Sequence, residues 1–281
     1  MKPAFLLIAL STLTSLAQGD LNPPPGDPTA TMKTLDQLES RTPIPPSPAT
    51  PVAGPHFTIT QPGSYYLTGN ITVASGDAIV VTAGRDVSID LKGFTIASTL
   101  TGSANGIAIS VPLNFTGLTV CHGKISSGTV VPGNGAAPLL AGFASGINVI
   151  NNDTNATYSA GTIHSECLIS DVHVHGCGND GIDAGRYSII ENCTARNNGM
   201  IGIEAFYSSV TACTASNNGT GIGCYYGSIT RSTATANINS GISTGFGVAA
   251  HCIAKDNLTL GVATYQITSV FGQRTQCLPP N

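Results

Sequence analysis

Charged side chains are scarce in this sequence, and tryptophan is absent. Only 9% of the 281 residues are Asp, Glu, Lys or Arg, and only 6% are aromatic. The formal net charge of −4 leaves no basic surface that would attract the phosphate backbone of a nucleic acid. No apolar run reaches the about 20 residues that a membrane-spanning helix needs. The sequence therefore predicts neither a nucleic-acid partner nor a transmembrane segment.

Glycine is abundant instead, with 33 residues, and part of it forms a repeat. A Gly followed by Ile or Val recurs at Gly106-Ile107, Gly146-Ile147, Gly181-Ile182, Gly202-Ile203, Gly221-Ile222, Gly241-Ile242 and Gly261-Val262. The last five copies lie 21, 19, 20 and 20 residues apart. A period of this length is typical of a solenoid, in which each coil stacks on the one before.

Between these pairs the sequence alternates apolar and polar residues, as short β-strands do. Ile190, Cys193 and Ala195 are predicted to point inward, with polar residues between them facing water. Asn and Gly recur at the turns, as in 197–199 and 217–219, where they tolerate a left-handed backbone. We therefore expect an all-β, single-stranded parallel β-helix over residues 56–281. Each coil should contain about 20 residues and three short strands.

The N-terminal part of the chain differs from the repeat. Residues 1–19 combine Lys2, a short apolar run and small residues, which is the pattern of a signal peptide, and predict a secreted, periplasmic or cell-surface protein. Residues 20–55 are rich in proline and predict an extended arm. Within the arm, residues 32–41 fit a short amphipathic helix, which we interpret as a cap on the first coil.

The repeated Gly-Ile pairs, the Asn-rich corners and the segment 192–194 with its echo 212–214 resemble a known family. They are similar to the secreted right-handed parallel β-helix proteins of the pectate-lyase-like superfamily. Residues 57–73 and 87–96 resemble the opening coils of bacterial members whose function is not established. The resemblance implies a right-handed helix that binds or cleaves extracellular polysaccharide, or acts as a non-catalytic surface or adhesion protein.

Motifs of the family's hydrolases are missing, because no two Asp are adjacent and no Arg-x-Lys occurs. An enzyme of this sequence would therefore more readily be a polysaccharide lyase than a glycoside hydrolase. Asp183 and Glu204 each follow a Gly-Ile pair and should stack one coil apart, near Arg186 and Asp180. They could form a calcium-assisted lyase site or a paired-acid glycosidase site. The alternative is a solvated acidic ladder.

Two histidines, His173 and His175, alternate on a predicted strand and should face the same side. This spacing suits zinc or copper, if His164 or Glu166 supplies another ligand. That would make the chain a metal-binding periplasmic β-helix protein. The alternative is that both are ordinary polar residues on the outside of a strand.

Residues 126–144 and 151–165 interrupt the period, and such insertions often carry binding sites. Asn152 and Tyr158 would suit sugar hydroxyls. Tyr207 and Tyr225, with Tyr226 and Phe246, follow successive Gly-Ile triplets and are expected to form an aromatic ladder. Such a ladder could bind a sugar ring, or its rings could only pack on one another.

Eight cysteines occur in a chain that is predicted to be exported, so disulfides are permitted. Cys193, Cys213 and Cys252, however, occupy inward positions of equivalent strands, where thiols would stack without bonding. Taken together, the residues predict an exported protein that interacts with carbohydrate in a lateral groove near the inserted loops. Catalysis, the sugar and the oligomeric state stay open.

Overall fold

The computed structural model describes residues 40–111, 115–132, 136–149 and 165–259, and the backbone of 262–264 and 267–269. The chain divides into two compact units between Ser40 and Arg41. The predicted signal peptide and nearly all of the predicted capping helix fall in the first unit and lie outside the described residues. No helix in the described part is long and apolar enough to cross a membrane.

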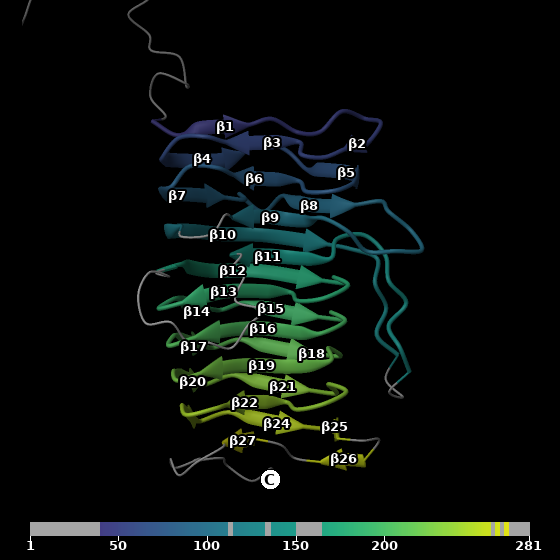
Figure 1. The fold of residues 1–281 in the computed structure, drawn as a ribbon, viewed down its shortest axis with the longest axis vertical. Coiled ribbons are helices and arrows are strands. Elements are labelled where there is room, and N and C mark those ends of the chain that lie inside the picture. The colour runs from purple at the N-terminus through teal and green to yellow at the C-terminus, as the bar shows by residue number, and fades with distance from the viewer. Residues whose placement is uncertain are drawn as a thin grey trace, which may run out of the picture. The chain divides into compact units, whose positions relative to one another are not determined.

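The second unit is all-β, and its described residues form two long parallel sheets and one short antiparallel pair (Figure 1). Sheet B has nine strands: β3 (Phe57–Ile59), β6 (Ile79–Val81), β9 (Ile107–Val111), β11 (Ser145–Val149), β13 (Ile182–Arg186), β16 (Ile201–Phe206), β19 (Thr220–Tyr225), β22 (Ile242–Thr244) and β27 (Ile267–Ser269). The antiparallel pair is β25 (Asn257–Thr259) and β26 (Val262–Thr264).

Sheet A has sixteen strands, which form two rows. Row 1 contains β1 (Thr42–Ile44), β4 (Gly63–Leu67), β7 (Arg85–Asp90), β10 (Thr116–Ser126), β12 (Leu168–His175), β14 (Ile189–Glu191), β17 (Ser209–Thr211), β20 (Ser228–Thr230) and β23 (Val248–Ala250). Row 2 contains β2 (Val52–Ala53), β5 (Ile71–Ser75), β8 (Thr95–Ser98), β15 (Thr194–Arg196), β18 (Thr214–Ser216), β21 (Thr233–Thr235) and β24 (Ile253–Lys255). The long strands β10 and β12 run through both rows.

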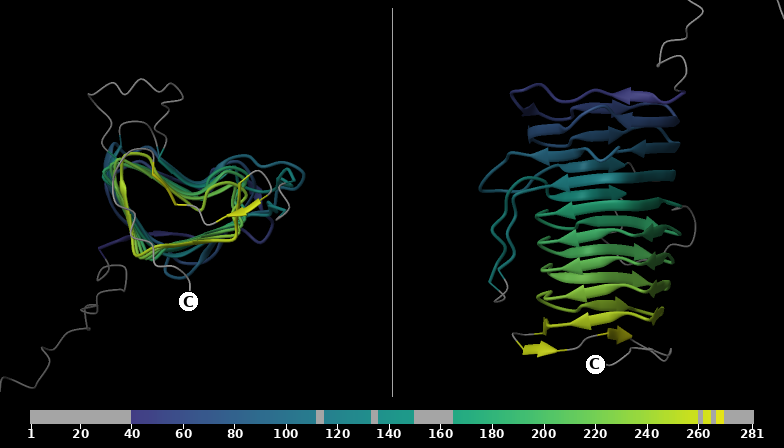
Figure 2. Two further views of the ribbon diagram at one scale, coloured as in Figure 1. Left: turned by 90° about the horizontal axis from the view of Figure 1, so that it is seen from below. Right: turned by 180° about the vertical axis from the view of Figure 1, so that it is seen from behind.

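Each coil passes through sheet B, then row 1, then row 2, and the next coil repeats this order. Strands β13, β14 and β15 pair with β16, β17 and β18, which pair in turn with β19, β20 and β21. Viewed along the stack, these coils superpose closely (Figure 2). The architecture is a parallel β-solenoid with three short strands per coil, as the repeat predicts.

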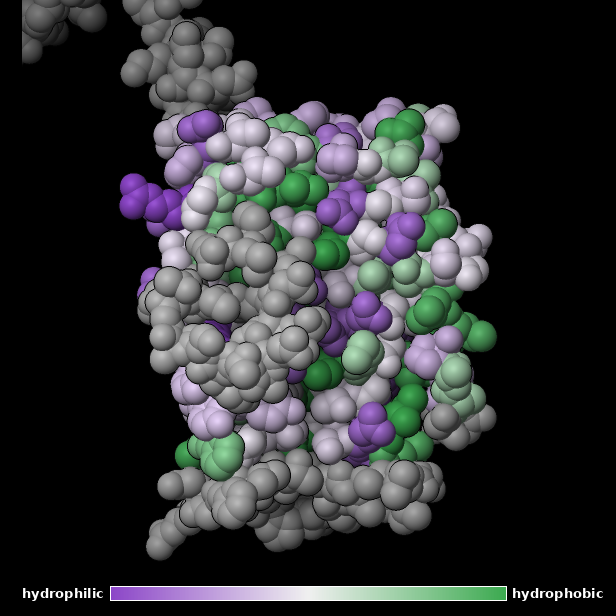
Figure 3. Space-filling model, viewed as in Figure 1, coloured by the Kyte–Doolittle hydropathy of each residue, from purple (hydrophilic) through white to green (hydrophobic). Residues whose placement is uncertain are grey.

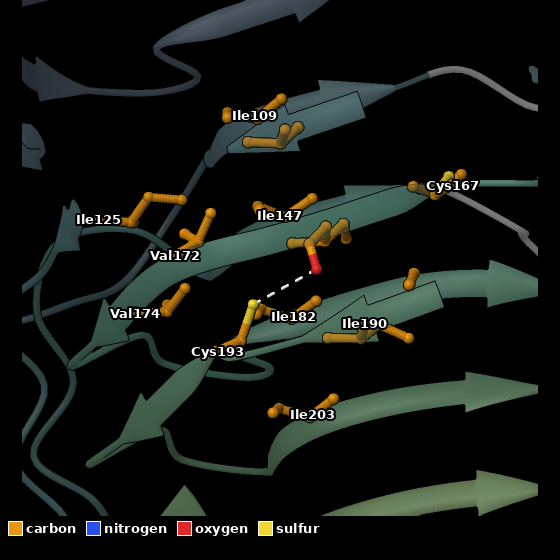
Figure 4. Packing of buried hydrophobic residues seen from close by; sticks show 14 of the residues in the cluster. Ile109, Ile125, Ile147, Cys167, Val172, Val174, Ile182, Ile190, Cys193 and Ile203 are labelled. Atoms are coloured by element: carbon orange, nitrogen blue, oxygen red, sulfur yellow. Dashed lines mark hydrogen bonds between the residues drawn. The ribbon is translucent and has the colours of Figure 1, made fainter. Parts of the chain in front are cut away.

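The core consists of equivalent side chains from successive coils. Ile182, Ile203, Ile222 and Ile242 are register partners in turn, and all four are fully buried. Figure 4 shows this stacking for the isoleucines of four consecutive sheet B strands. Side chains alternate between the two faces of a strand, and the hydrogen bonds between coils keep the strands in register. The isoleucine of each Gly-Ile pair therefore takes the same inward-facing position in each of these coils.

Thiols stack in the same way at the start of row 2. Cys193 and Cys213 are buried and free, and each donates a hydrogen bond to a backbone carbonyl of the preceding coil. Ser232 occupies the same station one coil later, and Cys252 follows it. The predicted stacking of Cys193 on Cys213 is confirmed.

A buried column of asparagines runs through the corner between row 2 and sheet B. We call Asn198, Asn218, Asn237 and Asn257 the asparagine ladder, and each is 0% exposed. The side-chain amide of each of the first three donates to Oδ1 of the next, at 2.9, 3.1 and 2.8 Å. Every one of these Oδ1 atoms also accepts a backbone N–H from the preceding coil. Burial is tolerated because the amide groups are satisfied.

The asparagine ladder explains why the repeat needs glycine before isoleucine. A Cβ placed on Gly202 would lie 2.7 Å from Asn218 Nδ2 and 2.7 Å from the carbonyl oxygen of Gly221. A Cβ on Gly181 or on Gly221 would meet the same two groups, which are the side-chain nitrogen of a ladder asparagine and the carbonyl oxygen of the next glycine in the repeat. None of these three glycines has a positive φ. Close approach of the ladder, and not backbone freedom, therefore accounts for them.

The sheets begin earlier than the sequence predicts. Strands β1 and β2 lie inside the proline-rich segment 20–55 and pair with β4 and β5. Proline is tolerated there because β1 is the outermost strand of row 1 in the described structure, so Pro43 needs to supply no N–H to a further strand. Residues 41–55 therefore contribute the first coil of the solenoid.

The first insertion is anchored where it leaves the coil. Thr129 Oγ1 donates to the Ala141 carbonyl and accepts the Ala141 amide, both at 3.0 Å. Phe143 is buried, whereas Leu139 is 67% exposed. The loop runs beside the corner that holds the asparagine ladder, since a Cβ on Gly178 would lie 3.5 Å from Leu140. The second insertion lies almost entirely outside the described residues.

Candidate functional site

The outer face of sheet B carries a column of mostly polar residues from six successive coils. The column contains Ser110, Asn148, Asp183, Glu204, Gly223 and Ser243, each the register partner of the next. Asp183 on β13 and Glu204 on β16 are thus direct neighbours on adjacent strands, whose backbones lie about 4.8 Å apart. This is the placement that the Gly-Ile triplets predict.

Both carboxyls are partly buried, and their pKa values are raised. Burial raises the pKa of Asp183 to about 7, against a hydrogen bond from the Gly185 amide at 3.1 Å. Burial, followed by the charges of Asp183 and Asp180, raises the pKa of Glu204 to about 8. Near neutral pH one carboxyl can therefore hold a proton while its neighbour is ionised, as acid–base chemistry requires.

Asp180 completes an acidic trio at the corner before β13. Its Oδ1 accepts the Ile201 amide at 2.9 Å, and burial raises its pKa in spite of that bond. In the described structure, however, the carboxylates of Asp180, Asp183 and Glu204 do not all come within 4.8 Å of one another. The trio therefore lacks the converging oxygens that calcium prefers, and proton sharing is the simpler consequence of its geometry.

Arg186 lies at the end of β13, beyond the acid pair. Its guanidinium carbon is 5.7 Å from the centre of the Tyr207 ring on the next coil. An arginine over an aromatic face is attracted to the ring electrons. Arg186 therefore connects the acidic face of sheet B to the aromatic residues at the following corner.

That corner, between sheet B and row 1, carries an exposed aromatic ladder. We use this name for Tyr187, Tyr207, Tyr226 and Phe246, whose ring centres lie 5.6, 4.8 and 4.8 Å apart in turn. The three tyrosines have positive φ values of 55°, 51° and 61°, so each occupies the sharp turn itself. Exposed fractions of 48% for Tyr187 and 52% for Phe246 show that the ladder lies on the surface.

The predicted membership of this ladder needs correction. Tyr225 stacks on Phe206, with ring centres 5.2 Å apart, and is not part of the aromatic ladder. Tyr187 belongs to it but was not predicted. The sequence signal is an aromatic residue followed by Ser or Gly, as in Tyr187-Ser188 and Tyr207-Ser208. The buried Ser208 accepts the Ser188 amide at 2.8 Å, which fixes successive turns behind the rings.

The histidine pair lies on the opposite side of the coil, in the part of β12 that belongs to row 2. His173 and His175 are both exposed, as the alternation predicts. His173 lies between Lys124 and Thr194 of the adjoining coils. Among the described residues, neither histidine joins two further His, Cys, Asp or Glu side chains in a group that could hold a metal.

The proposed additional ligands do not change this result. Glu166 precedes β12 and is therefore at the other end of the strand from the histidines, so it is not a ligand to them. His175 Nε2 accepts a hydrogen bond of 2.9 Å from Asn197 Nδ2. His164 lies outside the described residues, as do the predicted sugar-binding residues Asn152 and Tyr158.

Charged residues make up only 9% of the sequence. Figure 3 shows one face of the molecule, on which strongly hydrophilic residues are separated by weakly polar and apolar ones. No protein-family model, curated protein or solved structure matches the chain. The function must therefore be argued from the local chemistry of sheet B and its neighbouring corner.

Proposed function

We propose that this chain is an exported, right-handed parallel β-helix protein of the pectate-lyase-like type that binds extracellular carbohydrate. The binding surface is the outer face of sheet B together with the aromatic ladder. The observation that carries the proposal is the ladder itself, because its four rings follow one another on consecutive coils and three of them are exposed: Tyr187, Tyr207 and Phe246, at 48%, 37% and 52%. Export is inferred from residues 1–19.

The ladder offers a particular kind of contact. Its rings cover much of one another's faces, so the outward surface consists of ring edges and of the phenol ends of Tyr187, Tyr207 and Tyr226. Phenol groups both donate and accept hydrogen bonds, and contact between ring edges and the C–H groups of a sugar removes apolar surface from water. A polysaccharide lying along the stack would meet the same contact on each coil.

Cleavage of the bound carbohydrate is a second candidate, which the acid pair favours. Asp183 and Glu204 have raised pKa values and lie on adjoining strands beside the aromatic corner. In this scheme one carboxyl donates a proton to the leaving oxygen while the other acts as base or nucleophile. Arg186 would hold an acidic group of the substrate. A non-catalytic surface protein is the alternative if no product forms.

Binding is tested with the purified mature chain and a panel of neutral and uronate polysaccharides, by affinity electrophoresis and calorimetry. We expect retention on at least one polymer, and weaker retention for Tyr207→Ala. Met200→Ala is the matched control, because Met200 is 55% exposed at the opposite corner of the same coil. Equal affinity of Tyr207→Ala and wild type would contradict the proposed surface.

Cleavage is tested on the same panel by ultraviolet absorbance of unsaturated products and by release of reducing ends, with and without calcium. An active wild type with inactive Asp183→Asn and Glu204→Gln variants supports the acid pair. Binding without any product assigns the chain to the non-catalytic class.

A further inference from the structure

A second cluster of reactive side chains lies on row 1 of sheet A, away from sheet B. Asp90 ends β7, and Cys121 is its register partner on β10. His122 follows Cys121 directly. One ligand atom from each of these three residues lies within 4.8 Å of the other two. They form the one group of at least three His, Cys, Asp or Glu residues with that geometry in the described structure.

The backbone explains how two successive residues can face the same way. Neighbouring side chains normally point to opposite faces of a strand. His122, however, has φ of 56°, a left-handed conformation that turns the chain between the two rows. Cys121 is consequently partly buried on the outer face, and the His122 side chain is 60% exposed beside it. Both reach the carboxylate of Asp90.

The corner itself does not require either residue. The stations that follow Cys121 hold Ser170, Glu191, Thr211, Thr230 and Ala250, and those that follow His122 hold Asp171, Asn192, Ala212, Arg231 and His251. The other cysteines in the described residues are buried, whereas Cys121 is partly exposed. Packing therefore gives no reason for this combination of thiol, imidazole and carboxylate.

Asp90 is held by several neighbours in a fixed orientation. Its Oδ2 is 2.9 Å from Arg41 Nη1, and its Oδ1 accepts the Lys92 amide at 3.0 Å. Although burial opposes ionisation, these bonds and His122 together lower the pKa of Asp90. The Lys92 ammonium lies 4.4 Å from the ring centre of Tyr66, and Arg41 is 5.0 Å from it. The carboxylate therefore keeps Oδ1 directed at His122.

The geometry points to a zinc-type divalent metal site, and we propose that Asp90 Oδ1, Cys121 Sγ and His122 Nδ1 are its three ligands. In tetrahedral zinc sites, bonds of about 2.0–2.3 Å place neighbouring ligand atoms about 3.3–3.6 Å apart. His122 Nδ1 and Asp90 Oδ1 are 3.3 Å apart. The mixture of sulfur, nitrogen and oxygen favours zinc over calcium or magnesium.

Metal binding displaces the thiol proton of Cys121 and moves the imidazole hydrogen of His122 from Nδ1, where it faces Asp90, to Nε2. The Cys121 S–H bond gives way to a metal–sulfur bond, and its proton passes to solvent. His122 binds through the Nδ1 lone pair and carries its hydrogen on Nε2, which faces water. Arg41 then stays on Asp90 Oδ2 as an outer partner, as is usual for ligating carboxylates. The fourth position of the metal is open to solvent on the exposed side of His122.

The site is tested by titrating the chelator-stripped, full-length mature chain with cobalt and zinc. Cobalt should produce the near-ultraviolet charge-transfer band of a thiolate ligand at one equivalent per chain, and zinc should abolish it by competition. Cys121→Ser should lose the band, and His122→Ala should bind zinc at least about tenfold more weakly. Far-ultraviolet circular dichroism establishes that both variants fold.

His251→Ala is the matched control, because His251 occupies the equivalent turn with φ of 55° next to Ala250. It should bind as wild type does. A His173→Ala, His175→Ala double variant removes the other histidine pair and should leave the charge-transfer band unchanged. Absence of the band at saturating cobalt, or its persistence in Cys121→Ser, would overturn the proposal. Neither result bears on carbohydrate binding at sheet B.

Discussion

The two corners that flank sheet B distribute polar and apolar side chains in opposite ways. The corner before the sheet buries four asparagines, each at 0% exposure. The corner after the sheet holds four aromatic residues, of which three are exposed, with Phe246 at 52%, and Tyr226 is half-buried. Both arrangements repeat on consecutive coils, and both consist of like residues in contact with like. The two corners differ in one respect. The hydrogen bonds in the first corner explain why its residues are asparagines, whereas the contacts in the second corner do not explain why its residues are aromatic.

In the asparagine ladder, the Asn218 side chain takes part in four hydrogen bonds: to the Ala195 carbonyl and Asn237 Oδ1, and from the Asn198 amide and side chain. Removing it leaves buried groups unpaired. The aromatic ladder fills no interior space, and ring contacts at a surface contribute less to folding than buried hydrogen bonds do. The proposed carbohydrate surface would account for this row of aromatic residues, which packing in the core does not.

The largest expected effect comes from breaking the buried corner. Asn218→Ala should lower the free energy of unfolding by about 3–5 kcal/mol, because it orphans several buried donors and acceptors. Urea denaturation followed by circular dichroism measures the loss. Asn239→Ala, an exposed asparagine at the same corner, should change it by less than about 0.5 kcal/mol. Similar losses for both would mean that the asparagine ladder is not structural.

The strip of sheet B between the corners should respond to pH. Asp183 and Glu204 have ordinary pKa values of 3.8 and 4.5 and folded values of about 7 and about 8. Since the folded chain binds more protons between these limits, stability should fall as pH rises from about 4 to about 8. With both groups partly exposed, we expect a fall on the order of 1–3 kcal/mol.

Thermal or urea unfolding across this pH range measures the slope. Asp183→Asn combined with Glu204→Gln should flatten it and raise stability at pH 8. Asp86→Asn, at an exposed acid on β7, should leave the slope as it is. A slope of the opposite sign in wild type would show that the pair is ionised and satisfied at neutral pH, and would remove it as an acid–base site.

The smallest effect on stability is expected at the aromatic corner. Tyr207→Ala should cost about 1 kcal/mol, since two ring contacts and the contact with Arg186 are lost at the surface. Its carbohydrate affinity should nevertheless fall about fivefold. Differential scanning calorimetry and the binding assay together separate the two roles. A loss of stability comparable to that of Asn218→Ala would make the aromatic ladder structural and end the contrast between the corners.

The sequence repeat predicts the stacking of its middle copies but is wrong at both ends. Ile182 and Ile203, and likewise Asp183 and Glu204, follow from the spacing of the Gly-Ile pairs because the hydrogen bonds between coils keep equivalent positions in register. Ile109, and not Ile107, pairs with Ile147. Ile267 pairs with Ile242, while Val262 lies in the antiparallel pair of β25 and β26.

The spacing of the repeat does not predict whether the side chain of a turn residue points inward or outward. Asn197 has the left-handed backbone that was predicted for the corner, while its neighbour Asn198 is buried in the ladder.

The same limit explains the errors at the site. Tyr225 and Tyr226 are adjacent, and the left-handed turn at Tyr226 separates them into two stacks. Spacing alone cannot say which of the two joins Tyr207. The pairing of Cys121 with Asp90 across coils and the turn at His122 likewise depend on local backbone, so no period in the sequence indicates that cluster.

The hydrogen bonds of the asparagine ladder all run in the same sense. Asn198 donates to Asn218, Asn218 to Asn237, and Asn237 to Asn257. Their amide dipoles therefore add along the axis of the stack, as peptide dipoles add along an α-helix, and each bond polarises the next. The solenoid thereby acquires an electrical polarity through its interior, positive toward Asn257, that owes nothing to its few formal charges.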